Sequence, residues 1–300
     1  MKKKIKNYKV SCLGSVYKNS KLEEVKLSIE SILNGSEKPD EIIIVIDGPI
    51  KSNLNKYLLE LKKGKRLKIC RNKNNLGLGL ALNKGLLKCR GELICRFDTD
   101  DINLFNRIKI SKEIFRDNQK LDILSSSVIE IIPSNEKLVK CNLKTLPINN
   151  KKIKKTLDIR NPINHPSVIF KKDKILDCGL YEDIKFFEDY YLWLKLRKAN
   201  CNFKNINEPL VIMHRRSPSD RRTGLNYSLK ELVFYIKAIK NNLVGPNFIL
   251  LTPLKIFFRL MPSSLQYCYK LFPWRKNYSI CKNPLYLKVY KFELLKIQNK

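Results

Sequence analysis

The chain has 300 residues, of which 43% are hydrophobic, so it can bury a sizeable core and is not a disordered chain. Its 60 Lys and Arg against 28 Asp and Glu give a formal net charge of +32, which invites an anionic partner. The basic residues are scattered over every segment, and no RNP-like aromatic motif, zinc-finger spacing or dense basic helix occurs, so no nucleic-acid partner is expected. Two histidines exclude a histidine-rich transition-metal site.

The first hundred residues alternate between short apolar runs and amphipathic segments. Residues 41–47 are a continuous apolar run between two acids, typical of a strand that is covered on both faces. The periodicity predicts strands at 8–16, 41–47, 67–70 and 92–97, and helices at 22–33, 51–62 and 77–88. This alternation predicts an α/β fold with a mostly parallel central sheet flanked by helices. Ligands bind such sheets beyond the carboxyl ends of the strands.

Three carboxylates, Asp98, Asp100 and Asp101, directly follow the predicted strand at 92–97. Clustered acids at the end of a half-buried strand repel one another and are costly to desolvate. Asp98 and Asp100 would project to the same side of an extended backbone, so a hard divalent cation shared with a phosphate would balance their charge. The alternative is a turn in which Asp100 or Asp101 caps a helix through residues 102–107.

The pattern becomes mixed after residue 120. A helix is predicted to begin at Glu188 and Asp189, where acids suit the helix dipole, so these two acids can be explained without chemistry. Tyr190 and Trp193 in this helix are expected in the core. Strands are predicted at 123–132, 137–143, 166–170 and 209–213, the first two as a hairpin across 133–135.

From about residue 226 the chain is predicted to be helical, and it becomes basic and apolar together. Residues 245–300 carry ten Lys and Arg and one acid, Glu293, between aliphatic and aromatic clusters. Segments of this composition lie on anionic bilayers, although a helical appendage packed on the preceding domain is the alternative. No signal peptide and no run of 18 apolar residues is found. We therefore expect a peripheral protein, with one domain at 1–225 and a helical basic extension at 226–300.

Six short motifs follow one another along the first two thirds of the chain. They are residues 10–17 (VSCLGSVY), 28–33 (SIESIL), 39–48 (PDEIIIVIDG), 75–85 (NLG and ALNKG), 96–101 (RFDTDD) and 188–193 (EDYYLW). Together they resemble the family 2 glycosyltransferases, which are inverting, nucleotide-sugar-dependent enzymes with a GT-A fold. The resemblance runs from about Val10 to Arg222. Within the family the chain is most similar to bacterial capsule, exopolysaccharide and lipopolysaccharide sugar transferases of the amylovoran type.

The resemblance implies a nucleotide-sugar site built from several motifs. Asp47 would accept a hydrogen bond from the base, which favours uracil and a UDP-sugar, although a turn aspartate before Gly48 is the alternative. The other residues implied near the nucleotide are Ser15, Tyr17, Asn75, Gly77, Asn83 and Asp98. Asn75, Gly77 and Asn83 could equally be helix caps and packing residues. The chain departs from many relatives at Ile46 and Leu82, where they carry a second acid and an arginine.

The resemblance also implies the metal and the catalytic groups. Asp98 would contact the ribose or the metal, and Asp100 would bind Mg²⁺ or Mn²⁺ bridging the diphosphate. Asp189 would be the general base for the acceptor hydroxyl, and Glu188 would orient it or contact the acceptor. His165 would lie on the acceptor side, with a core histidine as the alternative. Arg215, Arg221 and Arg222 would fold over the diphosphate or the acceptor, with a solvated basic loop as the alternative.

The expected function is transfer of a sugar from a nucleotide sugar to a hydroxyl of a lipid-linked or oligosaccharide acceptor in bacterial surface polysaccharide synthesis. We expect it in the cytoplasm, at the inner face of the membrane. The alternatives are a nucleotidyltransferase-like enzyme and a non-catalytic basic module that binds membrane or nucleic acid. No Gly-rich phosphate loop and no G-x-G-x-x-G follows the first predicted strand, which disfavours nucleotidyltransferases and Rossmann dehydrogenases.

Overall fold

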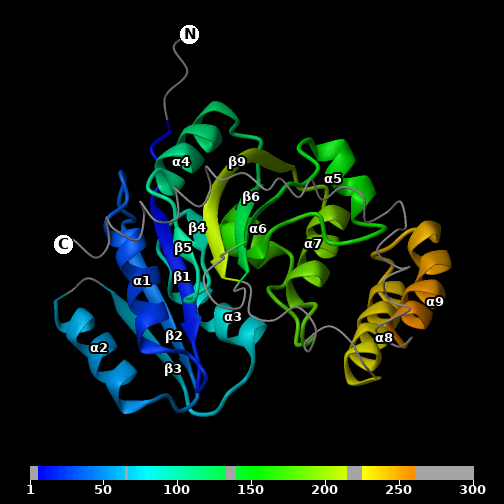
Figure 1. Ribbon diagram of the computed structural model, residues 1–300. Coiled ribbons are helices and arrows are strands. Elements are labelled where there is room, and N and C mark those ends of the chain that lie inside the picture. The colour runs from blue at the N-terminus through cyan, green and yellow to red at the C-terminus, as the bar shows by residue number, and fades with distance from the viewer. Residues whose placement is uncertain (1–5, 65–66, 133–139, 215–224, 261–300) are drawn as a thin grey trace, which may run out of the picture.

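The structure, a computed structural model, describes residues 6–64, 67–132, 140–214 and 225–260. These residues hold a nine-stranded sheet in the order β3 (Lys68–Asn72), β2 (Glu41–Asp47), β1 (Val10–Val16), β4 (Leu93–Arg96), β8 (Ile169–Lys171), β6 (Ile123–Ile132), β9 (Phe203–His214) and β5 (Ile102–Asn103), with β7 (Lys140–Lys144) paired to β6. The helices are α1 (Leu22–Leu33), α2 (Ser52–Lys63), α3 (Leu78–Lys88), α4 (Arg107–Asp117), α5 (Asn150–Thr156), α6 (Lys172–Asp177), α7 (Glu188–Lys198), α8 (Leu225–Lys240) and α9 (Pro246–Leu260). Figure 1 shows helices on both faces of the sheet.

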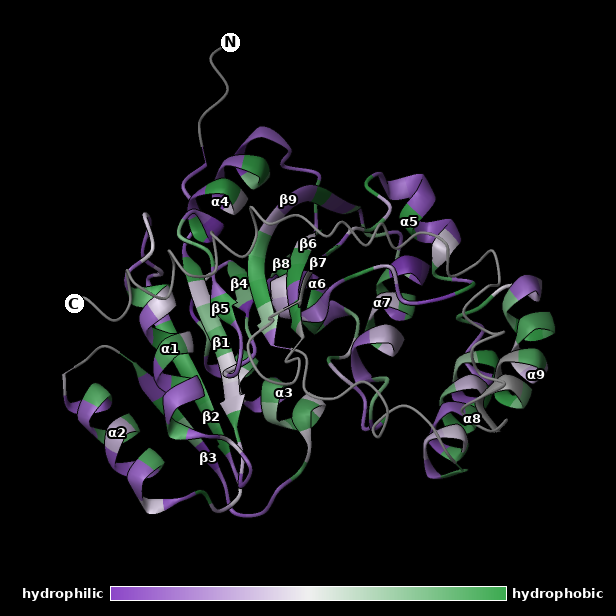
Figure 2. Ribbon diagram, in the orientation of Figure 1, coloured by the Kyte–Doolittle hydropathy of each residue, from purple (hydrophilic) through white to green (hydrophobic). Residues whose placement is uncertain are grey.

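The first four long strands form the parallel half of the sheet that the sequence predicts. β1 pairs in parallel with β2 and with β4, and β2 pairs in parallel with β3. Every residue of β2 after its first is buried, and successive residues enter two different cores because strand side chains alternate between faces. Ile43 and Val45 pack with α3 and α7, whereas Ile42, Ile44 and Ile46 pack with α1 and α2. The strand appears in Figure 2 as a hydrophobic band inside the fold.

The second half of the sheet is mixed. β8 is antiparallel to β4 and to β6, β6 is parallel to β9, and β5 is antiparallel to β9. The strand predicted at 166–170 is wrong in its first half, because His165–Ser167 forms a short 3-10 turn and β8 begins at Ile169. Pro166 suits a turn, and the Ser167 hydroxyl accepts from the backbone N–H of Ser126 at 3.0 Å.

The helix considered at 102–107 is also absent. Ile102 and Asn103 pair with Ile212 and Val211 of β9 instead, and α4 begins at Arg107. Tertiary pairing with β9 therefore overrides the local capping pattern after Asp101.

The C-terminal helices continue the core of the sheet domain. Every aromatic and aliphatic residue of α7 is buried, including Tyr190 and Trp193 as predicted. Phe234 of α8 stacks on Phe187 at a ring-centroid distance of 4.9 Å and lies 5.0 Å from Tyr190. Figure 1 shows α8 and α9 beyond α7, at the end of the molecule away from β1–β3. In the described part of the chain, no helix is long and apolar enough to cross a bilayer.

Candidate active site

The site lies where the parallel strands end. Asp47 closes β2, and Asp98 follows β4, with β1 between them in the sheet. Neighbouring strands are about 4.8 Å apart, so the two strands that carry these acids lie about 10 Å from each other. Ser15 and Tyr17, at the end of β1, are partly exposed between them. The topology thus brings three of the sequence motifs, residues 10–17, 39–48 and 96–101, to the carboxyl-end edge of the parallel strands.

The turn after β4 is fixed through its own backbone and side chains. The Asp98 carboxylate accepts two bonds from Arg96, at 2.5 and 2.6 Å, and remains about a third exposed (31%), whereas Arg96 is almost fully buried (1%). The Thr99 hydroxyl donates to the carbonyl of Ser15 at 2.9 Å, and the Ser28 hydroxyl donates to the carbonyl of Asp98 at 2.9 Å. The turn therefore presents Asp98 outward while its main chain is tied to β1 and α1.

Asp101 belongs to the fold rather than to the open face of the site. Its carboxylate is buried and accepts from the backbone N–H of His214 at 3.0 Å. Burial, together with the charges of Asp98 and Asp100, raises the pKa of Asp101 well above its usual range. The ring of His214 also bonds the carbonyl of Asp100 through Nδ1 at 2.8 Å. The end of β9 thus holds the partly exposed Asp100 in place.

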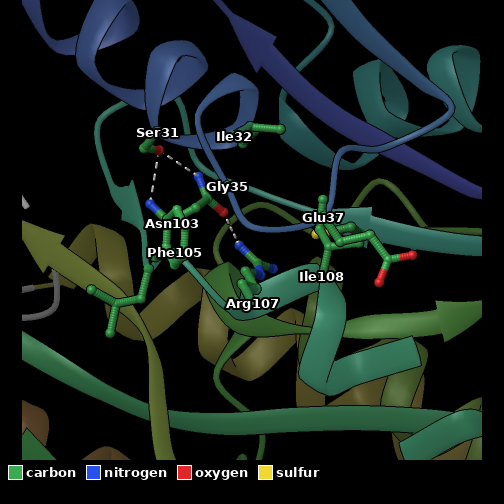
Figure 3. Close-up of a pocket in the computed structure, with 10 residues that line it drawn as sticks. Ser31, Ile32, Gly35, Glu37, Asn103, Phe105, Arg107 and Ile108 are labelled. Atoms are coloured by element: carbon green, nitrogen blue, oxygen red, sulfur yellow. Dashed lines mark hydrogen bonds between the residues drawn. The ribbon is translucent and has the colours of Figure 1, made fainter. Parts of the chain in front are cut away.

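A buried polar network anchors the chain directly after this turn (Figure 3). The Ser31 hydroxyl accepts from the backbone and side-chain nitrogens of Asn103 at 2.9 and 3.2 Å, and Arg107 donates to the Asn103 side chain. Arg107 also donates to the carbonyl of Arg96 at 2.6 Å. The small pocket drawn there is lined by none of the predicted site residues. The bonds of Asn103 and Arg107 beside it anchor the turn.

Asp47 organises the loop that follows β3. One carboxylate oxygen accepts from the Asn72 side chain at 2.8 Å and from the backbone N–H of Leu76 at 3.0 Å, and the other from the N–H of Gly77 at 2.9 Å. Asn75 donates from its side chain to the carbonyl of Asp47 at 3.1 Å. The structure therefore brings together three of the predicted nucleotide residues, Asp47, Asn75 and Gly77, and the base contact of Asp47 stays a prediction.

Asn83 joins α3 to the loop that leads into α7. Its side-chain oxygen accepts from the N–H of Tyr181 at 2.9 Å, and its nitrogen donates to the carbonyl of Tyr181 at 2.8 Å. One turn earlier, a Cβ on Gly79 would lie 3.2 Å from the Cβ of Glu188, so this glycine permits the close approach. Asn83 thus positions the acid-bearing helix, and its contact with a nucleotide stays a prediction.

The two acids at the start of α7 have different surroundings. Asp189 accepts from the Asn161 side chain at 2.8 Å and from the backbone N–H of Tyr190 at 2.7 Å. One oxygen of Glu188 is buried and has no hydrogen-bond partner within the described structure. Burial first, and then the charge of Asp189, raises the pKa of Glu188 to about 7. Asp98 raises and Arg96 lowers the same pKa, so the α7 acids and the β4 turn share one electrostatic environment.

His165 lies under the site rather than in it. The ring is 8% exposed, its Nε2 is 3.0 Å from the Tyr181 hydroxyl, and Trp193 packs edge-on at a centroid distance of 6.0 Å. Burial and the charge of Arg96 lower the pKa of His165 well below its usual range, so the ring is neutral at pH 7. An acceptor contact stays a prediction. Arg215, Arg221 and Arg222 lie outside the described residues.

The structure adds four residues that the sequence analysis did not single out for a role. They are Arg96, Asn161, Tyr181 and His214. Arg96 has a local signal, since an arginine two residues before an aspartate on a strand points to the same side. The other three depend on contacts between distant segments.

The carboxylates at the β4 turn suit a hard divalent cation. Mg²⁺ and Mn²⁺ prefer oxygen ligands, and Mg²⁺ is commonly held by one or two carboxylates together with substrate phosphates. Asp98 and Asp100 supply such a pair, both partly exposed. In the part of the chain that the structure describes, no three His, Cys, Asp or Glu side chains converge. The residues therefore fit a cation that is completed by a diphosphate and water.

The comparisons with known proteins agree with this geometry. A family model described as Glycosyl transferase family 2 matches residues 15–179. The chain is 34% identical over 267 residues to the UDP-Gal:alpha-D-GlcNAc-diphosphoundecaprenol beta-1,3-galactosyltransferase of Escherichia coli, covering 87% of this chain and 95% of that one. It is 33% identical over 228 residues to the amylovoran biosynthesis glycosyltransferase AmsE of Erwinia amylovora, covering 75% and 84%.

Solved structures show the same fold. S. aureus TarS residues 1–349 in complex with UDP-GlcNAc superpose with a TM-score of 0.61 at 14% identity, covering 96% of this chain and 81% of that one. The chain spans 46% of a longer TarS structure, with a TM-score of 0.59. The mannosyltransferase PcManGT from Pyrobaculum calidifontis, in complex with GDP-Man and Mn²⁺, gives 0.56 at 14% identity, covering 84% of this chain and 70% of that one. The chain belongs to glycosyl transferase family 2 and is a glycosyltransferase with the GT-A fold.

Proposed function

We propose that the protein transfers a sugar, with inversion, from a UDP-sugar to a hydroxyl of a lipid-diphosphate-linked glycan in bacterial surface polysaccharide synthesis. The observation that supports this most is that Asp98 and Arg96 both act on the charge of Glu188, as expected if the donor-side carboxylates and the α7 acids serve one site. The names of two relatives, a diphosphoundecaprenol galactosyltransferase and an amylovoran transferase, support the donor and the acceptor class.

In the proposed reaction, Asp189 is the general base. The acceptor hydroxyl donates to Asp189 and gives up its proton as its oxygen attacks the anomeric carbon, while the bond from that carbon to the diphosphate oxygen breaks and UDP leaves. A single in-line displacement converts an α-linked donor into a β-linked product. The bonds from Asn161 and from the N–H of Tyr190 fix the direction of the Asp189 carboxylate.

Glu188 would orient the acceptor beside the base. With a pKa of about 7, it is partly protonated near neutral pH and can donate to an acceptor oxygen as well as accept. Its buried oxygen, which lacks a partner within the described residues, supports a contact with a second hydroxyl of the acceptor.

On the donor side, Asp47 with Asn75, Gly77, Ser15 and Tyr17 would line the nucleotide. Asp98 and Asp100 would hold Mg²⁺ or Mn²⁺, which when bound supplies positive charge against the departing diphosphate. We also propose that residues 1–225 form the catalytic domain and 226–300 an extension, and that the protein works as a peripheral protein at the inner face of the cytoplasmic membrane.

The test is transfer from a panel of UDP-sugars to an α-linked GlcNAc-diphospho-lipid, with the product's anomeric configuration read by NMR. We expect a β-linked product from one donor, and a rate about 10³-fold lower for Asp189→Asn, with UDP binding unchanged, because the base is lost and the donor site is not. An α-linked product, or full activity of Asp189→Asn, would overturn the proposed mechanism. No transfer from any UDP-sugar would overturn the donor assignment.

A further inference from the structure

α8 has apolar residues on the face that points away from the protein. Leu225, Leu229, Leu232, Val233 and Ile236 are 38–66% exposed, and their spacing places them on one side of the helix. The opposite side carries Tyr227, Phe234, Tyr235 and Ala238, all buried against α7 and α9. A solvated surface helix would carry polar residues on its outer side. α8 is therefore apolar on both sides, and its outer side has the composition of a helix face that contacts a partner or a lipid surface rather than water.

α9 extends this surface. Ile249, Leu250 and Phe257 are 46–75% exposed, while Phe248 and Thr252 are buried toward α8. Figure 2 shows α8 and α9 side by side at the end of the molecule, with α9 coloured hydrophobic over much of its length. Single exposed leucines are ordinary on a protein surface, but several exposed apolar residues on two helices that contact each other mark an interaction surface. We call the exposed residues of α8 and α9 the outer apolar face.

The charged residues of α8 are mostly basic. Residues 225–240 contain three Lys and one acid, Glu231. Glu231 is buried and accepts from the Tyr235 hydroxyl at 2.7 Å, so it adds no exposed negative charge. Lys240 is exposed, and Lys230 and Lys237 are partly exposed along the flank of α8, where Lys237 pairs with Glu182 at 2.9 Å. An apolar face with a basic rim complements an anionic lipid surface.

The same charges disfavour two other occupants. A second copy of the chain would bring the two basic rims together. The chain's own residues 261–300 carry eight Lys and Arg and one acid, so they too would add like charge to this face. Repulsion between like charges opposes both arrangements, whereas an anionic bilayer gains from every lysine near its surface.

The outer apolar face is joined to the catalytic helix. Phe187, which precedes Glu188, packs on Tyr227 at a centroid distance of 5.3 Å as well as on Phe234. Its neighbour Phe186 is 43% exposed, lies 5.7 Å from the Tyr227 ring and carries the Lys230 ammonium 5.0 Å above its own ring. Phe186 and Phe187 thus connect the inner side and the flank of α8 to the acids that begin α7.

We propose that the outer apolar face of α8 and α9 lies on the anionic bilayer and sets the height of the Glu188–Asp189 site above the lipid headgroups. This rests on the proposed function, since a lipid-diphosphate-linked acceptor presents its sugar next to the membrane. Docking through this face brings the general base to the acceptor without any helix entering the bilayer core.

The test is sedimentation of the full chain with phosphatidylglycerol–phosphatidylcholine vesicles, without donor or acceptor. The double variant Leu229→Gln/Ile236→Gln removes two apolar side chains from the face, and the matched control Leu59→Gln/Leu87→Gln removes two exposed leucines from α2 and α3. We expect binding to weaken at least about tenfold in the first and to stay unchanged in the second. Pure phosphatidylcholine vesicles should bind weakly, and added salt should release the protein.

Each contrary result has a definite meaning. Equal vesicle binding by the α8 variant and the wild type would overturn the assignment of the face. Equal binding to neutral vesicles would overturn the anionic lipid partner. If the wild type binds no vesicles but forms a dimer that the α8 substitutions dissociate, the face binds a second copy of the chain. If the wild type binds no vesicles and is a monomer, the face is covered by the chain itself. Because no sugar is present, these outcomes are independent of the transfer assay.

Discussion

Four carboxylates of the site differ in charge and role because their neighbours differ. Asp47 accepts three bonds from its own chain, and Asp98 accepts two from the buried Arg96. Asp101 is buried among other acids, and burial with their charges raises its pKa. Glu188 is partly buried, with one buried oxygen unbonded within the described structure, and its pKa rises to about 7. The residue type alone therefore does not decide which carboxylate binds, which orients and which supports the fold.

Asp47→Asn should destabilise the protein even without nucleotide. An amide keeps one acceptor oxygen but places an NH₂ group against an N–H donor of the 72–77 loop, so at least one bond is lost. We expect a loss of about 2 kcal/mol in the free energy of unfolding, measured with urea. The exposed Asp183→Asn is the matched control and should change little. A variant that keeps full stability but loses UDP binding would assign Asp47 to the base alone.

Glu188→Gln should change how stability depends on pH. Above the ordinary pKa of 4.5 the unfolded chain releases this proton, whereas the folded protein keeps it up to a pKa of about 7. The wild type therefore loses stability as pH rises from about 4.5 to 7, by at most about 3 kcal/mol, and the neutral glutamine does not. Urea unfolding across this range should show the variant gaining on the wild type, and parallel curves would contradict the raised pKa.

At the scale of elements, α3 connects the sheet to α7, the helix that begins with Glu188 and Asp189. Gly85 packs against Leu13 of β1 and Val45 of β2, while Gly79 and Asn83 face the loop and helix that carry Tyr181 and Glu188. Small residues at these positions let the helix approach both partners closely. The position of α7 relative to the strand ends therefore depends on the face of α3.

Gly85→Ala should destabilise the protein although alanine favours helices. The added Cβ would overlap the side chains of Leu13 and Val45, which are fully buried and cannot move freely. Overpacking of this kind costs about 1–3 kcal/mol, more than the roughly 1 kcal/mol gained in helix propensity. Thermal unfolding is the measurement, with the exposed Lys88→Ala as control. A more stable Gly85→Ala protein would show that α3 can shift away from the sheet.

At the scale of the molecule, α8 faces two environments. Its inner side completes the aromatic cluster of Phe187, Tyr190 and Phe248, and its outer side is exposed. The inner side of α8 is packed as an appendage on the preceding domain would be, whereas lipid contact of the outer side stays a proposal. Residues 261–300 of the predicted basic segment lie outside the described residues.

Two adjacent residues of α8 separate these sides experimentally. Phe234 is fully buried, so Phe234→Ala should lower the free energy of unfolding by about 3–5 kcal/mol through lost burial and a cavity. Val233→Ala, on the exposed side, should change it by less than about 0.5 kcal/mol. Chemical denaturation followed by circular dichroism measures both. Similar losses for the two variants would mean that the outer side is covered within the protein.

Local patterns predicted much of the architecture. The helix at Leu22–Leu33 and the strands at Glu41–Asp47 and Ile123–Ile132 have the predicted bounds, because each has a strong hydrophobic period. The strand predicted at 166–170 was wrong in its first half, because the bonds of Ser167 to β6 outweigh local preference. The alternative helix at 102–107 does not form, because residues 102 and 103 pair with β9. The predicted strands also correctly place Asp47 and Asp98 at strand ends. The bonds of Asp47 to residues 72–77 could not be predicted, because they join segments that are distant in the chain.

The sequence by itself determined the parallel α/β half, the carboxylates at its strand ends, the acids that begin α7 and the family, since all of these depend on residues close together in the chain. The tertiary structure alone decided which groups share a site. The Arg96–Asp98 clamp, the raised pKa of Glu188, the bonds of Asn83 to Tyr181 and the outer apolar face depend on burial and on contacts across the fold. Burial depends on how the helices and strands pack against one another, so the residue types alone do not determine it.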